Sequence, residues 1–197
     1  MQKTVSVVIT THNRPDYLKE SLAAVLKQTV PPMEVFVIDD GSSVSYEEVL
    51  SLFPAKQFTY IKTPVASGAN AARNLGIDKS SADIIAFLDD DDIWLPNKLE
   101  KQLLLLDEIC DPELGLCYTA LEFIDVNGKK TGTVQSHHAS GNVLQELLCK
   151  NIVDCTSSVL VPKKVLDSVG GFREDISHAE DYDLWLRIAK RFNIYSV

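Results

Sequence analysis

Apolar residues in the first hundred positions alternate between short continuous runs and helical spacing. The runs that predict strands lie at residues 5–9, 34–38, 58–61 and 83–88. The segments whose spacing predicts helices lie between them, at 16–27, 46–52 and 69–78. Pro15 suits the first position of the first helix. Continuous apolar strands separated by helices indicate an α/β fold, with a mostly parallel central sheet and helices on both faces.

The second half of the chain has a less regular pattern. It predicts helices at 99–109, 165–169 and 182–191, and strands at 116–124 and 157–161. Asn127 and Gly128 predict a hairpin turn at 125–129, because both residues tolerate positive φ. Residues 193–197 have the pattern of a strand that is beginning, so we expect one domain over residues 1–197 that is truncated at its carboxyl end.

Composition narrows the possible classes of protein. A chain of 197 residues with 45% hydrophobic residues suits one globular core. The net charge of −9 argues against nucleic acid as a partner, because no cluster of Lys and Arg stands out. No apolar run approaches the roughly 20 residues that span a bilayer. We expect a cytoplasmic domain that meets the inner face of a membrane only through segments outside this sequence.

The four cysteines suit the same compartment. No pair has CxxC spacing, and all lie on otherwise apolar segments, so we expect reduced thiols in the core rather than disulfides or a zinc site. They are Cys110, Cys117, Cys149 and Cys155.

Polar residues follow the predicted strands at their carboxyl ends. The segments are residues 10–13, 39–40 and 89–92. Ligands of parallel α/β sheets bind beyond the carboxyl ends of the strands, so these segments predict the position of a site.

The run Asp89-Asp90-Asp91-Asp92 is the segment that points most specifically to a function. Four adjacent carboxylates repel one another unless a cation compensates them. Mg²⁺ and Mn²⁺ suit this run, since they use one or two protein carboxylates together with water and phosphate oxygens. The alternative is a solvated acidic turn or helix start. A calcium loop of the EF-hand type fits worse, because Trp94 stands where that loop needs glycine.

The other motifs each have a structural alternative. Asp40 and Gly41 could simply form a turn, and residues 10–15 could simply begin a helix. Arg73 lies on a helix of small residues, where it could reach a diphosphate or be an ordinary surface arginine. Asp181 lies in an acidic first helical turn, which is also good capping chemistry.

Taken together, the motifs resemble the family 2 glycosyltransferases, an inverting group with the A-type (GT-A) fold. The resemblance covers nearly the whole chain, in the family's order and spacing. The segments that carry it are residues 5–15, 37–42, 72–76, 89–94, 170–172, and Glu180-Asp181 before 184–187.

The resemblance implies a role for each motif residue. Thr10 and His12 would line the base pocket, with His12 where many relatives have a stacking tyrosine. Asp40 would accept a hydrogen bond from the base, and Arg73 would lie near the nucleotide.

Asp89 and Asp90 would contact the nucleoside sugar or donor sugar, and Asp91 would bind the metal. Asp181 matches the catalytic base. Residues 1–110 would form the nucleotide-sugar half and 111–197 the acceptor half.

The implied reaction moves a sugar from a nucleotide diphosphate, expected to be UDP, to a hydroxyl acceptor. Mn²⁺ or Mg²⁺ would stabilise the leaving diphosphate, and a carboxylate would take the proton of the attacking hydroxyl. The expected acceptor is a saccharide or lipid-linked saccharide in cell-surface polysaccharide synthesis.

Rival functions have weaker support from the sequence. A non-catalytic nucleotide-sugar-binding subunit is the alternative that stays open. A nucleotidyltransferase or a Rossmann dehydrogenase would need a glycine-rich loop after the first strand, and residues 10–15 contain no glycine.

Overall fold

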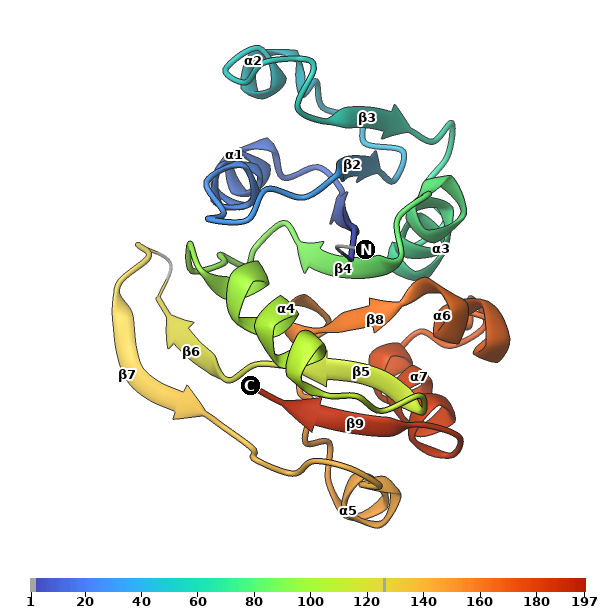
Figure 1. Cartoon of the computed structure of the whole chain (residues 1–197). Helices are drawn as coiled ribbons and strands as arrows, with labels where there is room; N and C mark the ends of the chain where they lie inside the picture. Colours follow the sequence, from blue (N-terminus) through green and yellow to red (C-terminus); the bar gives the residue numbers. More distant parts are fainter. Residues whose placement is uncertain (1–2, 126) are drawn as a thin grey trace.

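Seven strands form the central sheet of the computed structural model, which describes residues 3–125 and 127–197 (Figure 1). Their order across the sheet is β3 (Thr59–Lys62), β2 (Glu34–Asp39), β1 (Val5–Thr11), β4 (Ile84–Asp89), β8 (Leu160–Pro162), β5 (Leu114–Tyr118) and β9 (Asn193–Ser196). Among these described strands, only β8 pairs antiparallel with its neighbours. The prediction of a mostly parallel sheet is confirmed.

Helices cover both faces of this sheet, as predicted. One face is covered by α1 (Pro15–Leu26) and α4 (Lys98–Glu108), with the short α2 (Glu47–Leu50) beside α1. The other is covered by α3 (Ala69–Lys79), α5 (Leu144–Cys149), α6 (Lys163–Val169) and α7 (Glu180–Ala189). Side chains of β1 alternate between the two layers: Val7 and Ile9 pack toward α1, and Val8 packs toward α3. In Figure 1, α1 and α3 lie on opposite sides of the parallel strands.

Gly76 allows α3 to lie close to β1. A Cβ added there would stand 2.3 Å from Cγ1 of Val8. We expect Gly76→Ala to lower the free energy of unfolding by about 2 kcal/mol, because overpacking a filled core forces side chains or backbone to shift. Urea denaturation measures this, with the exposed Lys79→Ala on the same helix as the control. Alanine is the better helix former by about 1 kcal/mol, so a more stable Gly76→Ala protein would show that this contact is not tight.

One predicted strand is divided in two. The apolar pattern predicts a single strand over residues 116–124, but β5 ends at Tyr118, and β6 (Leu121–Ile124) pairs with β7 (Lys130–Gln135) in a separate two-stranded sheet. Most of β6 is exposed, whereas the central strands are buried. Apolar periodicity alone does not show where a chain leaves a sheet.

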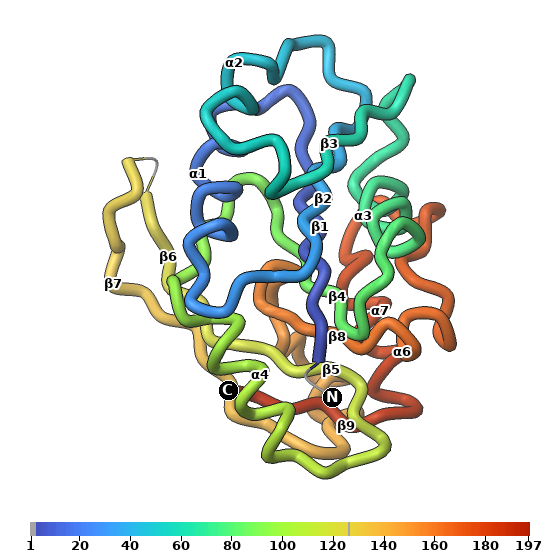
Figure 2. Tube along the Cα trace, turned by 45° about the horizontal axis from the view of Figure 1, so that its top comes forward, coloured from blue at the N-terminus to red at the C-terminus, as the bar shows by residue number. Residues whose placement is uncertain are grey.

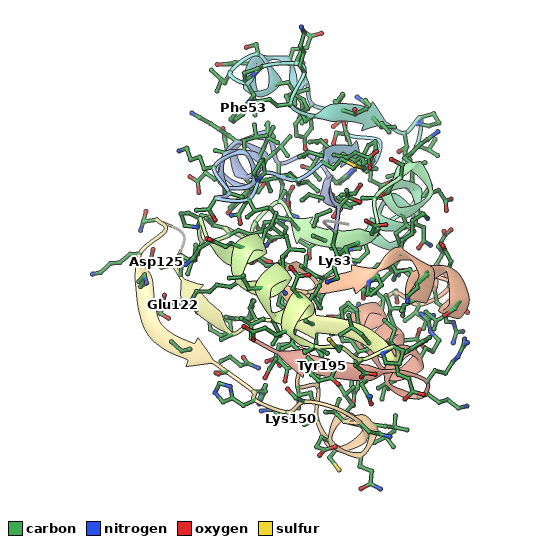
Figure 3. All side chains as sticks on the ribbon, viewed as in Figure 1. Lys3, Phe53, Glu122, Asp125, Lys150 and Tyr195 are labelled. Atoms are coloured by element: carbon green, nitrogen blue, oxygen red, sulfur yellow. The ribbon has the colours of Figure 1, made fainter. Side chains whose placement is uncertain are left out.

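The resulting β6–β7 hairpin stands away from the central sheet in Figures 1 and 2. Glu122 and Asp125 mark it in Figure 3. The predicted hairpin turn is confirmed at its ends: the Asp125 amide donates to the Lys129 carbonyl at 2.8 Å, and Gly128 has φ +74°. Val126 of the predicted turn lies outside the described residues.

Serine side chains account for a second difference. The pattern predicts a strand over residues 157–161, but residues Thr156–Ser158 form a 3₁₀ turn, η1, and β8 begins only at Leu160. The Ser158 hydroxyl donates to the Cys155 carbonyl at 2.7 Å, a local bond that competes with sheet pairing. The helix α5 has only six residues and is not predicted by the pattern.

The prediction that the four cysteines lie in the core is confirmed only in part. All four cysteines are free, and Cys117 is buried. Cys155 is partly buried, but Cys110 and Cys149 are exposed, because they lie at or just after the ends of α4 and α5. Among residues 3–125 and 127–197, no helix combines the length and apolar character that a membrane crossing requires.

Candidate active site

Strand pairing brings the predicted polar segments together. In the register of the sheet, Thr10 of β1 lies opposite Asp89 of β4, and Thr11 lies opposite Asp39 of β2. The three segments therefore meet at one edge of the sheet, beyond the carboxyl ends of parallel strands, where such folds bind ligands.

Backbone strain gathers in the loops around this edge. Among the described residues other than glycine, three have positive φ: Asn13 (56°), Asp154 (66°) and Ala179 (54°). Asn13 follows β1, Asp154 lies in the loop before η1, and Ala179 directly precedes α7. Strained backbone of this kind concentrates at functional sites, where the surrounding structure enforces it.

Arg73 joins the aspartate run to the start of α7. Its guanidinium lies 2.7 Å from Oδ1 of Asp89 and 3.2 Å from Oε1 of Glu180, over the ring of Phe172. Arg73 is buried, so the alternative of an ordinary surface arginine is wrong. Asp89 also accepts a bond from the hydroxyl of Thr10 at 3.2 Å. These contacts place the amino end of α7 beside the carboxyl ends of β1 and β4.

Arg14 pairs with both carboxylates in the middle of the aspartate run. Its Nη2 lies 2.5 Å from Oδ1 of Asp90, and its Nη1 lies 2.9 Å from Oδ2 of Asp91. Asp90 is buried and also accepts a bond from the Thr11 hydroxyl at 2.6 Å, whereas Asp91 is exposed. Burial raises the pKa of Asp90, and the bond from Thr11 and the charge of Arg14 oppose that rise.

Asp92 faces the 3₁₀ turn rather than the solvent. Its pKa is raised by burial, against bonds from Ser157 and Cys155 that lower it. Ser157 also accepts the backbone N–H of Asp89 at 3.0 Å, and its carbonyl accepts the indole N–H of Trp94 at 2.8 Å. Each of the four carboxylates thus has a partner, although Asp90 and Asp91 share Arg14, and these contacts limit the mutual repulsion that the sequence suggested.

A buried lysine lies beneath this turn. The ammonium of Lys98 lies 4.1 Å from the centre of the Trp94 ring and donates to Gln102 at 2.6 Å. Complete burial lowers the pKa of Lys98 to about 7. Trp94, Lys98 and Gln102 support the aspartate turn from the core side.

The carboxylate of Asp91 fits a hard divalent cation, since it is exposed and such cations bind oxygen ligands. Within residues 3–125 and 127–197, no group of three or more His, Cys, Asp or Glu could hold a metal ion by itself. A single exposed carboxylate suits Mg²⁺ or Mn²⁺, which bind through few protein ligands and take the rest from water and phosphate.

His12 and Asp40 shape the loop after β1. The His12 ring contacts the Asp40 carbonyl through Nδ1 at 2.6 Å and the Asn13 amide through Nε2 at 2.8 Å. Because Nε2 receives the amide N–H, these contacts suit the tautomer with hydrogen on Nδ1. His12 is exposed. The Asp40 carboxylate accepts the backbone N–H groups of Ser67 and Gly68, each at 2.8 Å. The Asp39 carboxylate, not that of Asp40, accepts the Ser42 N–H in the turn after β2, at 2.9 Å, so the turn-capping alternative for Asp40 is wrong. Its contact with a base stays a prediction.

Asp181 differs from the other acidic residues at the start of α7. Glu180 is paired with Arg73, and Asp183 is paired with Arg187 at 2.8 Å. Within the described part of the chain, Asp181 forms no ion pair. Burial raises its pKa, a bond from the Tyr182 N–H opposes the rise, and the charge of Glu180 adds to it. A carboxylate with raised pKa and no cation partner has the properties of a general base.

Two residues that hold this site together had no role in the sequence-based prediction. Arg14 lies within a segment that carries the family resemblance. It could have been found from the sequence because it is the one Lys or Arg among the polar residues after the first strand. Ser157 lies within a predicted strand, and no sequence pattern marks its contacts with the aspartate turn.

Comparison with known proteins identifies the group to which the chain belongs. The model of the family described as glycosyl transferase family 2 matches residues 6–170. The chain belongs to this family. It forms a family 2 glycosyltransferase domain.

Relatives of this domain include a protein of Rickettsia bellii described as an uncharacterised glycosyltransferase, 34% identical over 95% of this chain. The chain spans about a quarter of that protein, since the match covers 26% of it. A second relative is UDP-Glc:alpha-D-GlcNAc-diphosphoundecaprenol beta-1,3-glucosyltransferase WfgD of Escherichia coli, 31% identical over 98% of this chain and 72% of that protein.

Solved structures show that the fold is the GT-A fold. TarS 1–349 of S. aureus superposes with a TM-score of 0.78 at 21% identity, over 98% of this chain and 58% of that one. The same protein has been solved with UDP-GlcNAc. Mannosyltransferase PcManGT of Pyrobaculum calidifontis, solved with GDP-Man and Mn²⁺, gives a TM-score of 0.72 at 16% identity, over 100% of this chain and 55% of that one.

Proposed function

We propose that this domain is a metal-dependent, inverting glycosyltransferase that moves a sugar from UDP to a hydroxyl acceptor. One observation carries the proposal: Arg73 ties Asp89 of the aspartate turn to Glu180. This link sets the neighbouring carboxylate of Asp181 beside a turn that suits a metal and a diphosphate.

The donor would lie along the carboxyl edge of β1, β2 and β4. Thr10 and the exposed ring of His12 would line the base pocket, with Asp40 at its border. UDP is the nucleotide we favour, because WfgD is named for UDP-Glc and TarS has been solved with UDP-GlcNAc. Asp89 would contact the sugar part of the donor while Arg73 holds it in place. Asp90 is buried, so we propose that it acts by holding Arg14 rather than by touching the donor.

The metal would bind at Asp91, the exposed carboxylate of the turn. Mn²⁺ or Mg²⁺ supplies stabilisation of the negative charge on the leaving diphosphate. The Mn²⁺ in the PcManGT complex supports a divalent ion in this fold.

Asp181 would take the proton from the acceptor hydroxyl as that oxygen attacks the anomeric carbon of the sugar. Attack from the face opposite the diphosphate inverts that carbon. The acceptor we favour is a saccharide, free or linked to a lipid diphosphate, because WfgD is named for a diphosphoundecaprenol acceptor. Cell-surface polysaccharide synthesis is the corresponding process.

Nucleotide-dependent stabilisation tests the donor site. With Mn²⁺ present, UDP or a UDP-sugar at about 100 times its dissociation constant should stabilise the folded protein by roughly 2.7 kcal/mol, measured by thermal unfolding. Asp91→Asn should remove most of this metal-dependent shift and leave the stability of the metal-free protein within about 1 kcal/mol of the wild type, because the exposed pair of Asp91 with Arg14 is worth little.

Asp167→Asn is the matched control, since this exposed carboxylate lies on α6 and pairs with Lys163. It should keep the full shift. The donor-site proposal fails if no nucleotide stabilises the protein in the presence of Mn²⁺.

A further inference from the structure

We infer that Arg14 is an internal counter-ion that occupies Asp91 in the metal-free protein and leaves it when a divalent cation binds. This inference rests on the proposed function, in which Asp91 is the metal ligand. Arg14 would thereby compete with the metal for the Asp91 carboxylate.

The geometry shows one guanidinium shared between two unequal carboxylates. Asp90 lies 2.5 Å from Nη2 and its side chain is 0% exposed, whereas Asp91 lies 2.9 Å from Nη1 and its side chain is 49% exposed. The Arg14 side chain itself is 44% exposed. An ion pair with a buried carboxylate is hard to break, because a buried charge would be left without a partner. An exposed pair is worth little. Arg14 can therefore release Asp91 and keep Asp90.

Binding of a metal at Asp91 favours this release. A divalent cation on Asp91 would lie near the Arg14 guanidinium, and two positive charges at such a distance repel each other. The fork of Arg14 holds one Asp91 oxygen in a charge-assisted bond, which a metal must replace or avoid. Rotation of the half-exposed Arg14 end toward solvent moves Nη1 away from Asp91 and reduces the repulsion, while Nη2 stays with Asp90.

Each carboxylate of the aspartate turn has a partner in the metal-free protein. Asp89 is paired with Arg73, and Asp90 and Asp91 share Arg14. Asp92 is partly buried and accepts a bond from the Cys155 thiol at 3.3 Å. Two arginines thus offset part of the charge of the four carboxylates without a metal, and the attraction for a divalent cation grows when the donor diphosphate brings additional negative charge.

Titration with Mn²⁺ alone tests the inference, with free Mn²⁺ measured by electron paramagnetic resonance. Arg14→Gln removes the competing cation, so its affinity for Mn²⁺ without nucleotide should rise about fivefold over that of the wild type, the upper range for an exposed ion pair. Adding Asp91→Asn to Arg14→Gln should abolish the gain. Arg191→Gln removes the same charge from an exposed position just past the far end of α7 and should leave the affinity unchanged.

Arg14→Lys covers the case in which Arg14→Gln does not fold. A single ammonium can stay beside Asp90 but cannot bridge both carboxylates, so this variant should also bind Mn²⁺ more tightly, by a smaller factor. Unchanged or weaker Mn²⁺ binding in the folded variants would overturn the inference and make Arg14 an aid to the metal. The proposed function fails separately, if the wild type binds no Mn²⁺ even with UDP present.

Discussion

Asp181→Asn is expected to lower the rate of sugar transfer by a factor on the order of 10² to 10⁴, the usual effect of removing a general base. Asparagine keeps the size of the side chain but cannot take a proton from the acceptor. Binding of UDP and Mn²⁺ should stay within about twofold of the wild type, because Asp181 faces the acceptor in the proposed arrangement. Single-turnover transfer to a saccharide acceptor, alongside calorimetric titration with UDP, measures both quantities.

Asp183→Asn is the matched control for this variant. It lies two residues further along α7, and its carboxylate is already paired with Arg187. It should keep its turnover per folded molecule. Full turnover in Asp181→Asn would remove Asp181 from the mechanism, and would favour its interpretation as a helix cap.

The pH dependence adds a second readout. Because burial raises the pKa of Asp181, the rate should fall with decreasing pH at a higher pH than an ordinary aspartate would give. A carboxyl group whose folded pKa exceeds its unfolded pKa stabilises the fold at low pH, and this contribution is lost as pH rises through the folded pKa. Asp181→Asn should therefore be no less stable than the wild type at neutral pH, whereas loss of a cap would cost about 1 kcal/mol.

Arg73→Met is expected to lower the free energy of unfolding by about 3 kcal/mol, because it leaves Asp89 and Glu180 partly buried without their cation. This figure is the lower end for a broken buried pair, since both carboxylates are about a quarter exposed. Urea denaturation of the ligand-free protein measures it.

A second variant shows whether charge is the cause. Glu180→Gln combined with Arg73→Met removes one of the stranded carboxylates, so the double variant should be less destabilised than the sum of the two single variants. Arg191→Gln, at an exposed position, should change stability by less than about 0.5 kcal/mol. Additive effects of Arg73→Met and Glu180→Gln would contradict the link between the aspartate turn and α7.

The sequence was sufficient to predict the parallel half of the fold. Runs such as residues 5–9 are apolar almost throughout because both faces of β1 are covered, and such a run is typical of a buried parallel strand. The pattern was insufficient where the chain leaves the sheet: residues 116–124 are apolar enough for one strand, yet tertiary contacts end β5 at Tyr118. Local serine bonds displaced the start of β8 in the same way.

The candidate site was predictable in position but not in its internal partners. Strand ends located Asp40, Asp89 and Asp91 at one edge, because parallel strands share the direction of their carboxyl ends. Nothing local in the sequence shows that Asp90 turns inward to Thr11 while Asp91 faces solvent, or that Arg14 spans both. The bond from Thr11 to Asp90 joins residues 79 positions apart and that from Arg14 to Asp91 residues 77 apart, so both depend on how the loops pack.

A crystal structure with UDP and Mn²⁺ bound would show whether the carboxyl edge of β1, β2 and β4 is a metal-dependent donor site. We expect Mn²⁺ to be coordinated by the Asp91 carboxylate and the diphosphate. The uracil should lie beside Thr10 and His12, and the carboxylate of Asp181 should face the donor sugar from the side opposite the diphosphate. UDP bound elsewhere on the domain, or bound at this edge with Mn²⁺ on carboxylates other than those of the aspartate turn, would contradict this expectation.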